Sequence, residues 1–427
     1  MTGTVDGIWP LTGPVPALRT ADGVADVTSS APTAKADDAS ETEATATADS
    51  ESLPRVAFFT PAPSFGGAQR VTVTIANSLA KRGHDVDLVV GELAGEFAPI
   101  ISDAVNTVEL DVPDVPAVGI LAGIPSLVSY LESRRPAVLF ASRTHTNLAA
   151  VATGALADVD VHVAITEHSP FDYQDTARDR VTAALASRLY AYADDVITVS
   201  EGVARTVVDN TSVSTDGTTV LNNPIDIEAI GEGAEEPVGH DWLDDPELEP
   251  IVAVGRLEPV KGFSTLLEAF AALHESRPAT RLVVVGKGPH REELASLARE
   301  LGVADSVSFP GYTDNPYAYM GRASVFVLSS AVEGLPTVLI EALACGCTIV
   351  STDCQYGPRE ILEDGRYGRL TPVGDAERMA DAIGDALEDP TPPERGRERA
   401  QHFSMAAGAD RYESYIAAVT EGPRGSS

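Results

Sequence analysis

The sequence is poor in cysteine and has no long apolar run, and each shortage excludes a class of protein. Its 427 residues include 3 cysteines, at positions 345, 347 and 354, and three thiols so close together do not form a disulfide framework. No apolar stretch approaches the ~20 residues that cross a bilayer, and residues 1–10 lack the basic start and apolar core of a secretion signal. We therefore expect a cytoplasmic protein with reduced thiols.

Basic residues are scarce as well. The chain has 30 Lys and Arg against 64 Asp and Glu, a net charge of −34, and only 4 of the basic residues are lysine. A field of this sign repels nucleic acid, so we expect no nucleic-acid partner. An acidic surface with little lysine is typical of halophilic proteins, in which molar salt screens the self-repulsion to within ~3 Å. An ordinary acidic protein is the alternative.

Composition divides the chain into five segments. Residues 1–53 are mostly Ala, Thr, Asp, Ser and Glu, and such a stretch buries too little apolar surface to offset its chain entropy, so we expect a disordered acidic tail. Residues 54–227 and 250–403 alternate short apolar runs with amphipathic stretches. Between them, residues 228–249 are polar and acidic, as expected of a linker, and residues 404–420 form a last helical pattern.

The alternation predicts an α/β fold. Short continuous apolar runs are typical of strands buried on both faces of a parallel sheet, and amphipathic stretches between them are typical of covering helices. We therefore expect two Rossmann-like doubly wound domains facing a central cleft, with ligands beyond the carboxyl ends of the strands. The predicted strands lie at residues 56–59, 86–90, 138–141, 161–166, 196–199, 251–255, 282–286, 325–328 and 348–351, and the main helices at 68–81, 176–193, 262–274, 291–301 and 336–344.

The segment that follows the predicted strand 325–328 carries most of the chemistry. Pro336 has the φ favoured at a first helical position, which places Glu333 just before a helix and Glu341 in its second turn. The free N–H groups of the first turn would bind a phosphate, and the two carboxylates would accept hydroxyl groups. Phosphate flanked by hydroxyls describes a sugar nucleotide; the alternative is a Glu333 that only stabilises the helix dipole and a solvated Glu341. The expected donor contacts here are Gly334, Leu335, Pro336, Thr337, Val338 and Glu341.

Cations that would balance a diphosphate open the second domain. Arg256 ends a predicted strand and Lys261 precedes a helix, so both should reach the cleft, where they would bind neighbouring phosphate oxygens. On the opposite side, Gly66 and Gly67 would let backbone amides approach the donor phosphates closely. A plain surface pair and a glycine turn needed only for packing are the alternatives.

Three polar side chains are candidates for the acceptor side. His168 lies just past the predicted strand 161–166, where it would bind a hydroxyl group, although a structural histidine fits the same position. His145 and Asn147, after strand 138–141, are a weaker version of the same case.

No metal site is predicted. Asp85 and Asp87 have the Asp-x-Asp form, but they begin a strand and so lie away from the cleft. Cys345, Cys347 and Cys354 lack a fourth ligand at finger-like spacing.

Together these motifs resemble a known enzyme family. Glu333 and Glu341 match the E-x7-E element of family 4 of the retaining glycosyltransferases, which have the GT-B fold. The resemblance covers about residues 55–420, and the runs at 341–346 and 357–362 are similar to the branch that builds lipid-linked oligosaccharides and surface glycans. Its other matching runs lie at residues 66–70, 254–257, 261–262 and 285–289.

The resemblance implies a role for each matching residue. Glu341 would bind the donor ribose, Glu333 the donor sugar, and His168 would be the acceptor-side histidine. Arg256 and Lys261 would hold the diphosphate. The family usually needs no metal and retains the anomeric configuration, and its last helix, here about 405–419, crosses back to the first domain. Residue 69 is Gln where relatives often carry Glu.

The expected function is transfer of a sugar from a nucleotide diphosphate, with UDP-sugar as the expected donor, to a hydroxyl of a glycan or lipid-linked acceptor. The nucleotide sugar is a substrate, so no cofactor is expected. A GT-B sugar-nucleotide epimerase and a non-catalytic sugar-nucleotide-binding subunit are the alternatives. The helix at 176–193 carries Arg178, Arg180 and Arg188 and would rest on anionic lipid at the inner face of the cell membrane, unless it is simply solvated.

Overall fold

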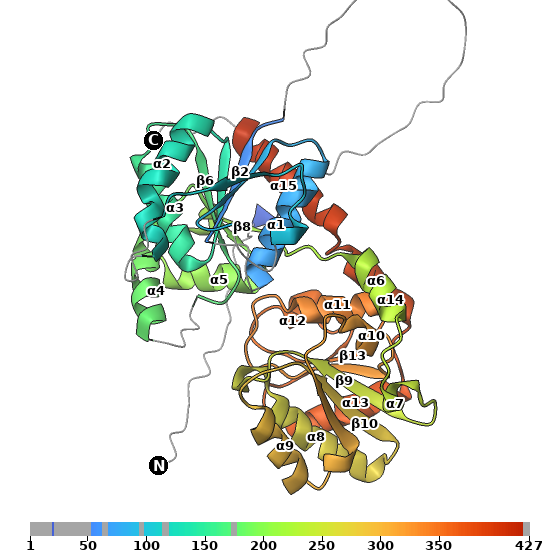
Figure 1. Cartoon of the computed structure of the whole chain (residues 1–427). Helices are drawn as coiled ribbons and strands as arrows, with labels where there is room; N and C mark the ends of the chain where they lie inside the picture. The colour runs from blue at the N-terminus through green and yellow to red at the C-terminus, as the bar shows by residue number, and fades with distance from the viewer. Residues whose placement is uncertain are drawn as a thin grey trace, which may run out of the picture.

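The computed structural model describes residues 19–20, 53–61, 67–93, 98–112, 119–171 and 177–421. Two parallel sheets form the centres of two domains, which lie one above the other in Figure 1. The predicted pair of Rossmann-like α/β domains is therefore confirmed. In the segment 1–53 the structure describes a two-residue strand, β1, and Leu53; the rest of the expected tail lies outside the described residues.

The strand order shows the doubly wound topology. The N-terminal sheet runs β1 (Arg19–Thr20), β8 (Thr218–Val220), β7 (Asp195–Thr198), β6 (His162–Glu167), β5 (Val138–Ser142), β2 (Val56–Thr60), β3 (Val86–Val90) and β4 (Asn106–Glu109). The C-terminal sheet runs β11 (Val307–Gly311), β10 (Thr280–Val285), β9 (Glu249–Val254), β12 (Val325–Leu328), β13 (Ile349–Thr352) and β14 (Arg369–Thr371). Among the described residues every pairing in these sheets is parallel.

Helices cover both faces of each sheet (Figure 1). The N-terminal domain contains α1 (Gly67–Lys81), α2 (Ile124–Arg134), α3 (Thr144–Leu156), α4 (Ala177–Leu189) and α5 (Glu201–Asn210). The C-terminal domain contains α6 (Ile227–Glu235), α7 (Asp241–Asp244), α8 (Phe263–Ser276), α9 (Arg291–Glu300), α10 (Tyr317–Met320), α11 (Thr337–Cys345), α12 (Pro358–Ile361), α13 (Ala376–Glu388) and α14 (Pro393–Gln401). The last helix is α15 (Met405–Glu421).

The central strands are buried along their whole length, as their continuous apolar runs predict. In the N-terminal domain the ring of Phe58 on β2 stacks on Phe140 of β5, with centroids 4.8 Å apart. Such burial leaves no room for polar loops on the faces of the sheet. Polar side chains therefore gather where the strands end.

Helix α15 returns to the N-terminal domain and packs beside α1 (Figure 1). The rings of Tyr412 and Tyr415 lie 5.6 and 5.9 Å from that of Phe140. Arg82, just past α1, forms an ion pair of 2.6 Å with Glu413. The end of the chain therefore ties the two domains together at a second place besides the connection before α6.

The stretch 228–249, expected as a linker, has a different character in the structure. It contains most of α6 and all of α7, and Ile230 and Leu243 are buried in the core of the C-terminal domain. Acidic side chains surround these few apolar positions, which is why composition alone suggested a linker.

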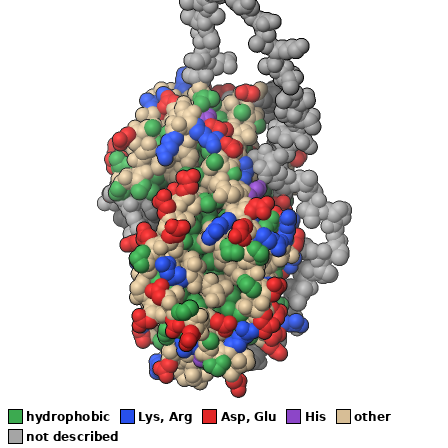
Figure 2. Space-filling view, turned by 90° about the vertical axis from the view of Figure 1, so that its right-hand side faces the viewer, with side chains coloured by type: hydrophobic (Ala, Val, Ile, Leu, Met, Phe, Trp, Pro, Cys, Tyr) green, Lys and Arg blue, Asp and Glu red, His purple; other side chains and the backbone are tan. Residues whose placement is uncertain are grey.

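Acidic side chains are spread over the face shown in Figure 2, with apolar side chains scattered among them. Nothing in this distribution measures a salt requirement, so adaptation to molar salt stays a prediction. Unlike these exposed acidic side chains, that of Asp87 is completely buried.

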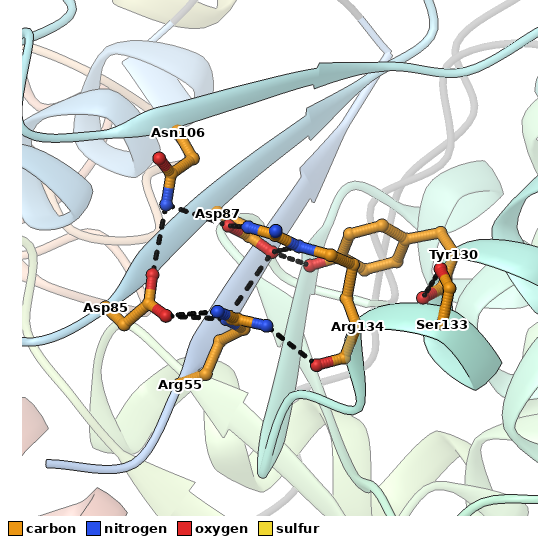
Figure 3. A network of polar contacts seen from close by, with 7 residues as sticks. All are labelled: Arg55, Asp85, Asp87, Asn106, Tyr130, Ser133 and Arg134. Carbon is orange, nitrogen blue, oxygen red and sulfur yellow. Dashed lines mark hydrogen bonds and ion pairs between the residues drawn. The ribbon is translucent and has the colours of Figure 1, made fainter. Parts of the chain in front are cut away.

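Asp87 is the centre of a polar network at the start of β3 (Figure 3). Its carboxylate accepts hydrogen bonds of 2.7 Å from both the Arg134 guanidinium and the Tyr130 hydroxyl, and Arg55 lies 4.0 Å away. Burial by itself would raise the pKa of Asp87, but these partners outweigh it and hold the pKa below its ordinary value. The Asp-x-Asp pair is therefore structural and lies at the end of the sheet away from His168.

Replacing Asp87 should destabilise the fold strongly. Asp87→Ala leaves Arg134 and Tyr130 without their acceptor, and breaking a buried pair costs about 3–5 kcal/mol, which urea unfolding would measure. Asp85→Ala is the control, because the Asp85 side chain is 40% exposed and its pair with Arg55 is worth about 0–1 kcal/mol. Equal losses in the two variants would contradict the network.

The same carboxylate predicts a pH dependence. Because the pKa of Asp87 is lower in the folded state than its ordinary 3.8, its contribution is complete above that value and is lost as the pH falls below it toward the folded pKa. The wild-type protein should therefore lose more stability below pH about 4 than Asp87→Ala does.

Candidate active site

A lysine and a glutamate from two different loops meet at the carboxyl end of the C-terminal sheet. The Lys261 ammonium lies 2.6 Å from Oε1 of Glu333, and the side chains are only 19% and 11% exposed. The hydroxyl of Ser330 donates to the same carboxylate oxygen at 2.6 Å. The predicted residues Lys261 and Glu333 are therefore held together as one polar unit.

The backbone explains why these loops touch. Gly262 has a φ of +65°, and a Cβ at this position would lie 2.0 Å from the carbonyl oxygen of Ser329. The amide of Ala331 donates to the Val260 carbonyl at 2.8 Å, and the Ser329 hydroxyl donates to the Lys261 carbonyl at 2.7 Å. Only glycine fits so close to the neighbouring loop, and this contact brings Lys261 to Glu333.

Helix α11 begins one residue later than predicted. Pro336 has a ψ of 95°, so it is the capping residue, and Thr337 is the first helical residue. The amide of Leu339 already donates to the Pro336 carbonyl at 3.0 Å. Within the described chain the amides of Thr337 and Val338 are thus the free donors of this turn, and Gly334 and Leu335 lead into it.

Glu341 lies in the second turn of α11 and is partly buried. Burial raises its pKa to about 7, and the positive charge of Arg70 opposes that rise. Arg70 belongs to α1 of the other domain, and it also interacts with the hydroxyl of Tyr317 on α10. The sequence assigned Arg70 no role, since nothing local relates residue 70 to residue 341.

Arg256 is separate from this group. Its side chain is 71% exposed and pairs with Glu258 at 2.8 Å. Arg256 does follow β9, as predicted, but in this structure it is Lys261 that contacts Glu333.

His168 directly follows β6, and it lines a small cavity of the N-terminal domain together with Ser142 and Thr166. Among the described residues neither of its ring nitrogens, both of which are buried, has a hydrogen-bond partner. Burial, with a smaller effect of Arg143, lowers the pKa of His168 to about 4, so the imidazole is neutral at pH 7. A Cβ at Gly334 would lie 2.3 Å from the His168 carbonyl oxygen, so the segment before α11 contacts His168 directly.

Asn147 and His145, the two weaker candidates for the acceptor side, differ in their surroundings. Asn147 is fully buried on α3, and its amide nitrogen donates to the Thr166 carbonyl at 3.0 Å, to Glu167 at 3.1 Å and to the Tyr190 hydroxyl at 3.2 Å. These contacts are directed into the core of the domain and favour a structural role for Asn147. His145 lies on the first turn of the same helix and is partly buried.

Two further predictions concern glycine and metal. Gly67 is the first residue of α1, and Gly66 lies outside the described residues. In the part of the chain that the structure describes, no group of three or more His, Cys, Asp or Glu side chains is arranged to hold a metal ion. The three cysteines are buried and free.

Comparison with known proteins identifies the family. The model of glycosyltransferase family 4 matches residues 65–229, and the model of glycosyl transferases group 1 matches residues 242–403. The two matches follow one another along the chain and correspond to its two domains. The chain belongs to the GT-B glycosyltransferases.

Two of the similar curated proteins are bacterial glycosyltransferases. This glycosyltransferase is 37% identical over 205 residues to the N-acetylgalactosamine-N,N'-diacetylbacillosaminyl-diphospho-undecaprenol 4-alpha-N-acetylgalactosaminyltransferase of Campylobacter jejuni, across 48% of this chain and 54% of that one. It is 36% identical over 193 residues to the lipopolysaccharide core biosynthesis glycosyltransferase LpsE of Rhizobium meliloti, across 44% and 55%. The match thus spans about half the length of these relatives.

Solved structures agree with the fold. The crystal structure of Anabaena HepE in complex with UDP aligns with a TM-score of 0.70 at 19% identity, over 85% of this chain and 100% of that one. At this identity the likeness establishes the GT-B fold of the glycosyltransferase and nothing finer.

Proposed function

We propose that this glycosyltransferase moves a sugar from a nucleotide-diphosphate donor to a hydroxyl of a glycan or lipid-linked acceptor, with retention of the anomeric configuration. The observation that carries the proposal is the grouping of Lys261, Glu333 and the free amides of α11 at one end of a sheet, opposite His168. A cation, helix amides and carboxylates in one place suit a diphosphate joined to a sugar.

Each group has a definite part in this proposal. Glu341 accepts the ribose hydroxyls, and Glu333 contacts the donor sugar beside the bond that breaks. The neutral imidazole of His168 both donates and accepts hydrogen bonds, which suits a hydroxyl group. Lys261 exchanges its bond with Glu333 for the phosphate oxygens, and Arg256 reaches them from solvent.

The identity of the substrates is inferred from relatives. UDP is the expected nucleotide, because Anabaena HepE has been solved with UDP. A lipid-linked acceptor is expected because the name of the Campylobacter relative specifies a diphospho-undecaprenol acceptor. The nucleotide sugar is a substrate, and no cofactor is proposed.

The two glutamates should fail in different ways. Glu341→Gln should weaken binding of UDP, whereas Glu333→Gln should mainly lower turnover, because charge develops on the sugar beside Glu333 in the transition state. Each loss should be on the order of 2 to 5 kcal/mol. The measurements are calorimetry with UDP and transfer from a panel of labelled nucleotide sugars in molar salt. Near-normal UDP affinity and turnover in both variants would contradict the assignment of this site.

The same panel separates the alternative functions. Formation of an isomeric sugar nucleotide without an acceptor would identify an epimerase. Binding of UDP without turnover of any labelled donor would identify a non-catalytic subunit. Transfer of label to an acceptor supports the proposal.

In place of a metal ion, Lys261 and Arg256 should stabilise the negative charge of the leaving diphosphate. Departure of the nucleotide diphosphate builds negative charge, and fixed donors can stabilise it. Turnover should therefore persist in EDTA, and Lys261→Ala and Arg256→Ala should each lower it roughly 10²- to 10³-fold. Activity that disappears in EDTA, returns with Mg²⁺ and survives both substitutions would assign the phosphates to a metal.

Helix α4 is the proposed membrane contact. Val181 and Leu185, one turn apart, are 72% and 48% exposed, and Arg180 and Arg188 are exposed beside them. The side chain of Arg178 lies outside the described residues. Among the described helices none is both long and apolar enough to span a bilayer. Apolar and basic side chains on one surface helix suit contact with anionic lipid.

Flotation tests this contact. The protein should float with phosphatidylglycerol vesicles in molar salt, and a Val181→Glu, Leu185→Glu double variant should float less, because it loses the exposed apolar surface. Val373→Glu is the control, since Val373 is 44% exposed in the other domain. Wild-type protein that stays at the bottom would exclude the contact.

A further inference from the structure

The motif at residues 357–362 has no role in the proposed chemistry, yet it forms one of the contacts between the domains. Glu360 lies on α12, and its side chain reaches the N-terminal domain. One carboxylate oxygen accepts the amide of Glu201 at 3.0 Å, and the other accepts the side-chain amide of Asn222 at 3.2 Å. A single side chain of one domain thus binds two elements of the other: the first residue of α5 and the segment after β8.

Both sides of this contact are fixed within their own domains. Arg399 on α14 donates to the Ile361 carbonyl at 2.8 Å and to the Glu360 carbonyl at 2.9 Å, which holds α12 in place. Asn222 also donates to the Val199 carbonyl at 2.8 Å. The contact therefore joins two rigid parts rather than two loose side chains.

A second contact lies next to the first. The Ser200 hydroxyl donates to the Gly334 carbonyl at 2.9 Å and accepts the Val203 amide at 3.2 Å as the cap of α5. Gly334 directly follows Glu333 in the chain. The beginning of α5 thus binds the segment that carries a proposed catalytic carboxylate.

The two contacts are mechanically connected. A Cβ on Gly357, just before α12, would lie 2.6 Å from the Pro336 ring and 2.8 Å from the Gly334 carbonyl oxygen. The start of α12 therefore packs directly on residues 334–336. Movement of Glu360 away from the N-terminal domain would shift both α12 and the segment before α11. Figure 1 shows α12 and α11 at the edge of the C-terminal domain that faces α5.

We infer that Ser200, Asn222 and Glu360 form an interdomain clasp that holds the domains closed and fixes residues 333–338 for transfer. This inference rests on the proposed function only in that the fixed segment is taken to serve sugar transfer. Asn222 and Glu360 are positioning residues, because they act through Gly334 and α12 and not on the substrate. When the domains separate, the carboxylate and its donors return to water, so the clasp exists only in the closed form.

An exchange of side chains tests the clasp. Burial raises the pKa of Glu360 to about 7, so the test is made at pH 9. There Asn222→Asp places a second ionised carboxylate against Glu360, and the repulsion should open the domains. Adding Glu360→Gln should reverse this, because the new amide group can donate to the carboxylate introduced at position 222, while its oxygen still accepts the Glu201 amide. Recovery should be incomplete, since a carboxylate at position 222 cannot donate to the Val199 carbonyl. Glu293→Gln, an exposed position on α9, is the matched control.

Two measurements need no substrate. In molar salt, Asn222→Asp should increase the radius of gyration in X-ray scattering and accelerate amide hydrogen exchange at residues 333–338. The double variant should return both toward the wild type. Values for Asn222→Asp that match those of Glu293→Gln would overturn the clasp, even if the variant remains folded and active.

Kinetics provide the third measurement. Misplacement of the catalytic segment should lower turnover on the order of 10²-fold in Asn222→Asp. The affinity for UDP should fall by a smaller factor, because the amides of Thr337 and Val338 belong to the displaced segment, whereas Lys261 lies outside it. The double variant should recover turnover. Loss of UDP affinity without loss of turnover would contradict positioning. Absence of transfer from every labelled donor, with scattering and exchange as expected, would reject the proposed function and leave the clasp standing.

Discussion

Strands buried on both faces leave only their ends to carry chemistry, and this constraint organises the whole molecule. Apolar side chains of β9 and β12 pack against helices on each side, so the first polar positions come in the loops that follow. Lys261 and Glu333 belong to two such loops, and β9 pairs directly with β12. Parallel pairing therefore places both loops at the same edge of the sheet, where one ion pair joins them.

The cations described around the site each have an acidic partner. Lys261 interacts with Glu333, Arg256 pairs with Glu258, and the positive charge of Arg70 acts on Glu341. In a chain with a net charge of −34, the pair with Glu333 holds the Lys261 ammonium at the site, whereas Arg256 is exposed and lies apart from it. In the proposal a diphosphate takes the place of Glu333 beside Lys261, while Glu341 remains available for the ribose. The lysine of the proposed donor site is thus in place before the donor arrives, and binding exchanges one anion beside it for another.

The domains are joined by contacts of two kinds. Helix α15 packs aromatic rings against Phe140, which buries apolar surface inside the N-terminal domain. Ser200 and Glu360 instead make hydrogen bonds next to the segment that carries Glu333. Apolar packing suits a permanent attachment, whereas a few hydrogen bonds that water can replace suit a contact that opens and closes.

Local patterns predicted the elements well. Strands 86–90 and 325–328 match β3 and β12 residue for residue, and the helix at 291–301 ends one residue early. The stretch 228–249 was misread, because acidic residues surround the few apolar positions that α6 and α7 bury. The start of α11 was placed one residue early, because the fixed φ of Pro336 suits a helix while its ψ of 95° does not.

The sequence by itself determined the two α/β domains and the strand ends at which polar residues gather. It also determined the spacing that places Glu333 just before α11 and Glu341 in the second turn of that helix. Only the tertiary structure decided that the charge of Arg70 acts on Glu341 and that Glu360 binds Asn222. The physical reason is the separation along the chain of the residues that each feature involves. Burial periodicity is set by neighbours a few residues apart, so it is written in the local sequence. Contacts between residues more than a hundred positions apart depend on how two complete domains pack, and no local pattern records that.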